Sequence, residues 1–231
     1  HSKDITSITI DDQNPHLIWI TANSTLLLVD IKANKKIWST SRLDKYGTNF
    51  NHVLPKGKAI WVSSQMGIHR LNRNFKLLKT YRLSTDTSFF ENQRISQLFY
   101  SSLDSLYIAT AQGLMVYSSA QDEFILHQGS AQLPSSYIYA IQEDSDQHLW
   151  LSTSNGLASY DVHTDKLKTY TAEDGLQSNL YITRSAEKLN TGELAFGGIN
   201  GFNIFTPEKI KTDTMPPRLL ITGLQIFNEH I

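Results

Sequence analysis

A short pattern recurs five times along this 231-residue chain. Each copy has an apolar run with an aromatic residue near its start, then a polar turn, then a second apolar run. The copies are LIWITANSTLLLVD from Leu17, AIWVSSQMGIHRLN from Ala59, SLYIATAQGLMVYS from Ser105, HLWLSTSNGLASYD from His148 and ELAFGGINGFNIFT from Glu193. Successive anchors lie 42, 46, 43 and 45 residues apart, and they are Trp19, Trp61, Tyr107, Trp150 and Ala195. A period of this length indicates repeated structural units that stack on one another.

Each unit contains four short β-branched and aromatic runs separated by Asn, Asp, Gly and Ser clusters, a pattern typical of antiparallel strands. In four copies a glycine lies six residues after the anchor, where we expect a turn with positive φ. These glycines are Gly67, Gly113, Gly156 and Gly201, and Thr25 occupies the position in the first copy. Four strands in this length match one β-propeller blade, and the anchor would fill the wedge between blades. A β-sandwich gives no reason for the period, and β-solenoid repeats are usually shorter.

The predicted fold is therefore an all-β propeller segment over residues 1–210. Its five blades are expected at about 5–42, 49–84, 94–129, 136–171 and 179–210. Little chain precedes the first blade, and the fifth has no evident fourth strand unless 218–227 supplies it. We therefore expect a partial arc of a larger, about seven-bladed ring that self-associates through its end blades, with a closed five-bladed ring as the alternative.

Composition excludes several functions. The net charge is −1 and the basic residues are spread along the chain, which argues against nucleic acid or an anionic membrane as a partner. The chain has no cysteine, so disulfides and thiolate metal sites are excluded. The eight histidines show no metal-binding spacing, and the acids of EDSDQH (143–148) fit a turn better than a calcium loop. We expect no cofactor, no metal and no catalytic residue.

The stretch IQEDSDQHLWLSTSNGLASYD (141–161) closely resembles the two-component-regulator propeller repeat. The fifth copy (191–210) resembles the last blade of these sensors, and 211–231 resembles a linker and the first strand of the immunoglobulin-like domain that follows in that family. The resemblance implies a periplasmic sensory segment of an inner-membrane receptor that relays to a cytoplasmic kinase or cyclase. Many members sense carbohydrate breakdown products, so a small molecule or oligosaccharide is the expected ligand, and the immunoglobulin-like domain is an expected partner.

Ligands of propellers bind over the central channel, near the start of each innermost strand. The residues expected there are Asn51, Arg94, Tyr137, Tyr139, Asn179 and Tyr181. Aromatic rings can stack on the apolar face of a sugar, and Asn and Arg can bind its hydroxyls. Two alternatives remain: a protein-interaction scaffold that binds through its rim or face, and a propeller lyase or hydrolase, for which no converging acids or histidines can be assembled.

Overall fold

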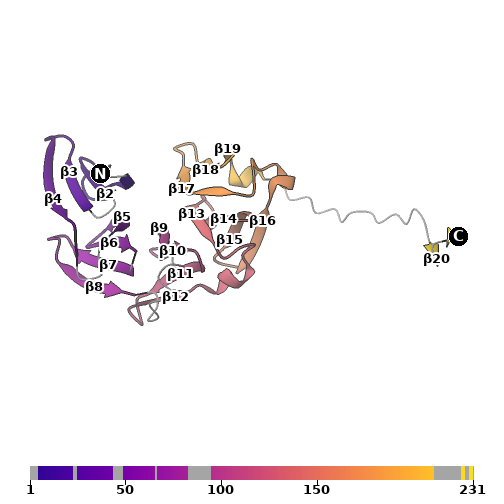
Figure 1. Cartoon of the computed structure of the whole chain (residues 1–231), viewed down its shortest axis with the longest axis horizontal. Helices are drawn as coiled ribbons and strands as arrows, with labels where there is room; N and C mark the ends of the chain where they lie inside the picture. Colours follow the sequence, from indigo (N-terminus) through magenta and orange to yellow (C-terminus); the bar gives the residue numbers. More distant parts are fainter. Residues whose placement is uncertain are drawn as a thin grey trace.

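The computed structural model describes residues 5–22, 25–43, 49–65, 67–82 and 95–210, with the backbone of 225–226 and 229–230. It confirms the predicted all-β propeller architecture (Figure 1). Within this described part, four sheets contain four antiparallel strands each and a fifth sheet contains three, always in chain order.

The strand bounds follow the repeat. Blade 1 contains β1 (Ile5–Ile10), β2 (Leu17–Ala22), β3 (Thr25–Asp30) and β4 (Lys35–Thr40). Blade 2 contains β5 (Phe50–Lys56), β6 (Ala59–Ser64), β7 (Gly67–Asn72) and β8 (Leu77–Tyr81). Blade 3 contains β9 (Ile95–Tyr100), β10 (Leu106–Thr110), β11 (Gly113–Ser118) and β12 (Glu123–Leu126).

Blade 4 contains β13 (Ile138–Glu143), β14 (His148–Thr153), β15 (Gly156–Asp161) and β16 (Lys166–Tyr170), and blade 5 contains β17 (Tyr181–Lys188), β18 (Leu194–Gly198) and β19 (Gly201–Phe205). Three short 3₁₀ turns lie between or after blades: η2 (Gln128–Gln132), η3 (Ala172–Asp174) and η4 (Pro207–Lys209). Among the described strands, β20 (Gln225–Ile226) and β21 (Glu229–His230) pair with each other and not with blade 5. Most of the segment that resembles an immunoglobulin-like start lies outside the described residues.

The anchor residues fill the wedges between blades, as predicted. Four apolar clusters join the five blades, and each contains one of the buried anchors Trp19, Trp61, Tyr107 and Trp150. The fifth anchor, Ala195, is only half-buried on the last blade. The turn glycines Gly67, Gly113, Gly156 and Gly201 all have the predicted positive φ.

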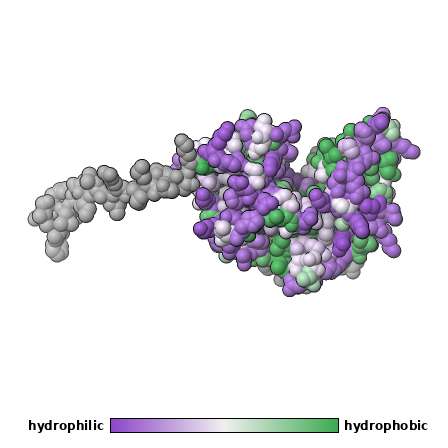
Figure 2. Space-filling model, turned by 180° about the vertical axis from the view of Figure 1, so that it is seen from behind, coloured by the Kyte–Doolittle hydropathy of each residue, from purple (hydrophilic) through white to green (hydrophobic). Residues whose placement is uncertain are grey.

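The blades form an open arc. Their first strands lie on its inner side and their last strands on its outer side, and a gap separates blade 1 from blade 5 (Figure 1). The two end faces are apolar and exposed: Ile8 on β1 is 60% exposed and Phe202 on β19 is 68% exposed. The same gap is visible from behind, with apolar surface on the arm that blade 1 forms (Figure 2).

Candidate ligand-binding site on the inner strands

Each inner strand contains a pairing irregularity near its start. In blades 1, 2, 4 and 5 the register shifts within the inner strand, between Ile5 and Ser7, Phe50 and His52, Ile138 and Ala140, and Tyr181 and Ala186. In blade 3 the shift lies between Gln97 and Ile95, which pair with Ala109 and Thr110. The extra residues in the first four blades are Thr6, Asn51, Ser96 and Tyr139. Bulges re-aim side chains and are common beside binding sites.

Three of the predicted ligand residues lie at or beside these bulges. Asn51 and Tyr139 are bulge residues, and Tyr137 directly precedes β13. The rings of Tyr137 and Tyr139 lie with their centroids 4.7 Å apart. Burial raises the pKa of Tyr139, and the neighbouring Tyr137 adds to the effect. Within the described part of the chain, no hydrogen bond engages the Asn51 amide or either tyrosine hydroxyl, so these polar groups are free to bind a ligand.

Two other predicted residues already have structural contacts. Asn179 accepts a hydrogen bond from the backbone N–H of Ala172 at 2.7 Å through its side chain, and its carbonyl accepts one from Gly156 at 2.9 Å. Tyr181 is buried between blades 4 and 5, and its hydroxyl donates to Asn203 at 3.3 Å. Burial raises the pKa of Tyr181 to about 12. The remaining predicted residue, Arg94, lies outside the described residues.

Arg184 is a residue at this site that the repeat pattern does not predict. Between Tyr181 and Ala186, β17 advances by five residues while its partner β18 advances by two, so β17 contains a long bulge. Arg184 lies in this bulge with a left-handed φ of 58°, and its guanidinium donates to the carbonyl of Asn51 in blade 2. A cation from the last blade thus reaches the inner strand of the second. The interrupted apolar pattern at 183–185 was the only signal for it in the sequence.

His52 connects blades 2 and 3 beside this cation. Its Nδ1 accepts a hydrogen bond from the backbone N–H of Leu98 at 3.1 Å, which requires an unprotonated Nδ1. Burial and, to a smaller extent, the charge of Arg184 together lower the pKa of His52 to about 3. Gln97 and Gln142 make comparable bonds to the next blade, at 2.8 Å to Ile141 and 2.9 Å to Ala186. The inner strands are therefore joined by polar bonds from blade to blade.

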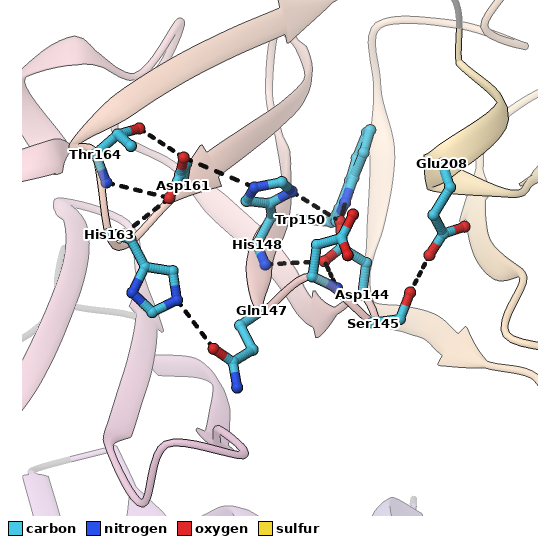
Figure 3. A network of polar contacts seen from close by, with 10 residues as sticks. Asp144, Ser145, Gln147, His148, Trp150, Asp161, His163, Thr164 and Glu208 are labelled. Carbon is cyan, nitrogen blue, oxygen red and sulfur yellow. Dashed lines mark hydrogen bonds and ion pairs between the residues drawn. The ribbon is translucent and has the colours of Figure 1, made fainter.

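A second polar cluster lies between blades 4 and 5, around Asp144 (Figure 3). The predicted turn is confirmed, because Asp144 accepts hydrogen bonds from the backbone of Asp146 at 3.0 Å and of His148 at 2.9 Å. Its carboxylate also accepts the indole N–H of Trp150 at 2.8 Å, and Asp11 accepts that of Trp19 at 2.9 Å. This acid therefore supports the wedge tryptophan. Among the described residues, no group of three or more His, Asp or Glu is placed to hold a metal ion.

Residues 132–155 match the family described as two component regulator propeller. This chain carries a two-component regulator propeller repeat. The matched residues include β13, β14 and the Thr153–Asn155 turn, which is the best-preserved part of the repeat. None of the helices that the structure describes is long and apolar enough to cross a bilayer.

Known proteins resemble this chain over most of its length. Histidine kinase P4 of Formosa agariphila is 25% identical over 96% of this chain, which spans only 17% of that protein. The extracellular domain of BT3049 from B. thetaiotaomicron, described as a hybrid two component system, superposes with a TM-score of 0.79. It is 22% identical, over 99% of this chain and 32% of that one.

The extracellular domain of BT4673 from the same organism gives a TM-score of 0.71 at 17% identity, over 87% of this chain and 27% of that one. At these identities the solved structures support the propeller fold of this chain. The chain spans less than a third of either solved structure.

Proposed function

We propose that this regulator propeller is a non-catalytic sensory segment of a transmembrane receptor, placed in the periplasm, that binds a small oligosaccharide and relays its presence to a cytoplasmic output domain. The single observation that carries the binding role is the set of unengaged polar groups on the inner strands, on Asn51, Tyr137 and Tyr139. The similarity to a histidine kinase and to extracellular domains of two-component systems supports the sensory role.

The chemistry of these groups suits a sugar. Paired tyrosine rings offer a flat apolar surface with hydroxyls at the edge, and the Asn51 amide offers both a donor and an acceptor. Arg184 holds the backbone beside Asn51 in place, which reduces the ordering cost of binding. The downstream immunoglobulin-like domain is the proposed route by which binding is passed on.

Binding can be tested by isothermal titration of the intact chain with a panel of neutral and acidic oligosaccharides. We expect at least one ligand to bind and both Asn51→Ala and Tyr137→Phe to weaken it about 10-fold. Ser39→Ala on the exposed outer strand β4 is the matched control and should leave the affinity unchanged. Unchanged affinity in both inner-strand variants, with the fold intact, would remove these residues from the site.

A protein-interaction scaffold is the second candidate, and the exposed apolar end faces favour it. Ile5, Ile8 and Ile10 on β1 and Phe202 and Ile204 on β19 are all exposed. A scaffold would bind another protein there and would show no saccharide binding in the titration above.

A further inference from the structure

A cavity lies between blades 2 and 3, away from the polar groups of the inner strands. Its volume is about 520 Å³, and its lining includes Lys56, Lys58, Trp61, Arg70, Tyr100 and Tyr117. A cavity of this size accommodates a small molecule. Among the described lining residues are three cations, three aromatic rings and one carboxylate, Asp104.

Arg70 departs from the pattern of the repeat. It pairs with the anchor Trp61 across β6 and β7. The residues that pair with the anchors of the other blades are uncharged: Leu28, Val116, Ser159 and Ile204. Placing a cation in an apolar wedge costs desolvation energy, so this substitution calls for a compensating partner.

The Tyr81 hydroxyl accepts a hydrogen bond from Arg70, but within the described part of the chain no carboxylate is paired with the guanidinium. The Nε of Arg70 is buried without a hydrogen-bond partner, and the guanidinium lies 5.4 Å from the centroid of the Trp61 ring. No ion pair joins it to a described carboxylate. Asp122, which accepts hydrogen bonds from Tyr81 and Tyr117, is instead paired with Lys79 at 2.7 Å.

Trp61 is also left with a free donor. In blades 1 and 4 an acid in the preceding turn accepts the indole N–H of the anchor, as Asp144 does for Trp150. In blade 2 the place that corresponds to Asp144 is occupied by Lys56, because Leu54 pairs with Trp61 as Gln142 pairs with Trp150. The Trp61 indole has no hydrogen-bond partner among the described residues. The Trp61 indole N–H and the Arg70 Nε thus both lack a described acceptor, and both residues line the same cavity.

Side chains of blades 1 and 2 hold the turn that carries the two lysines. The N–H of Gly57 donates to Asp12 at 2.7 Å, and its carbonyl accepts from Arg73 and from Gln13, both at 2.7 Å. Lys56 and Lys58 flank this glycine, and the Lys56 ammonium lies 5.2 Å from the centroid of Tyr100. The cations are therefore on a fixed backbone, as a preorganised anion site requires.

We infer that this cavity binds the carboxylate of an acidic sugar. Arg70 and the two lysines bind the carboxylate, and Trp61 and Tyr100 contact the apolar face of the sugar ring. The inference rests on the proposed saccharide-sensing function and extends it by assigning the ligand class and a second place of contact.

The test is isothermal titration of the whole chain with di- to tetrasaccharides of galacturonic, glucuronic and guluronic acid. The uncharged methyl ester of each saccharide is titrated in parallel. We expect at least one acid to bind about 10-fold or more tightly than its ester. Arg70→Leu and Lys56→Met should each remove about 10-fold of that affinity, while Lys36→Met on exposed β4 should not change it.

Arg70→Leu is expected to fold, because Leu28 occupies the corresponding position in blade 1. The unfolding temperature of this variant should be at least as high as that of the parent. Equal binding of acid and ester, or full acid binding by both variants, would overturn the inference while leaving the sensory function standing. Failure of every acidic and neutral sugar to bind would contradict both.

Discussion

At the scale of single residues, His52 links stability to pH. It is neutral in the folded protein, where its pKa is about 3, and its ordinary value of 6.5 applies in the unfolded chain. Protons therefore bind the unfolded chain first as the pH falls below 6.5. The stabilisation from neutral His52 is complete at pH 7.5 and decreases toward pH 3, by about 2 kcal/mol at pH 5.

The variant His52→Gln isolates this effect. Glutamine can accept the Leu98 N–H, as Gln97 accepts that of Ile141, but it does not titrate. We expect the free energy of unfolding of the parent to fall by about 2 kcal/mol more than that of the variant between pH 7.5 and 5. Chemical denaturation at both pH values measures this difference, and parallel pH profiles would contradict it.

Asp144 is a second residue with a large expected effect. Its replacement by alanine leaves the backbone N–H of His148 and the buried indole N–H of Trp150 without an acceptor. Asp144→Ala should therefore cost about 3 kcal/mol of stability. Asp146→Ala, in the same turn but exposed, should stay within about 0.5 kcal/mol. Urea denaturation followed by tryptophan fluorescence compares the two, and equal effects would exclude the capping role.

At the scale of the strands, the glycine turn depends on the fourth strand of its blade. Gly156 has a φ of 94°, and a Cβ there would lie 2.1 Å from the carbonyl oxygen of Tyr170, at the end of β16. Gly175 has the same φ, and a Cβ would meet nothing within 4 Å. Gly201 in blade 5 is similarly open, because no fourth strand follows β19 in the described chain.

Gly156→Ala should therefore destabilise the protein by about 3 kcal/mol or more, and Gly175→Ala by only about 1 kcal/mol. The first change adds a clash to the backbone strain, while the second adds strain alone. Thermal unfolding of both variants gives the comparison. A similar loss at both positions would show that β16 does not limit the space around Gly156.

The strands and turns differ in how far they could be predicted from the sequence. The anchors and turn glycines were predictable because each repeats with the period, and one blade explains the next. Arg184 and Arg70 were not, because each is a departure from the repeat: one lies in a bulge of unusual length, and the other replaces an uncharged wedge residue. The residues that distinguish this propeller from others of its fold are therefore those that a repeat pattern cannot locate.

At the scale of the whole molecule, four apolar clusters join the five blades in the described part of the chain, and the two end faces have no described neighbour. Ile8 and Phe202 are on these faces and are more than half exposed. Exposed apolar surfaces of this kind promote association. We therefore predict that the isolated chain self-associates through its end blades, and that the arc belongs to a ring of about seven blades.

Sedimentation velocity over a range of protein concentrations tests the open arc most directly. The sedimentation coefficient of the parent should rise with concentration, and the double variant Ile8→Lys and Phe202→Lys should remain monomeric. Leu78→Lys, at an exposed apolar residue of the outer strand β8, is the control and should associate like the parent. A parent chain that stays monomeric at every concentration would contradict the open arc and favour a ring closed by its own five blades.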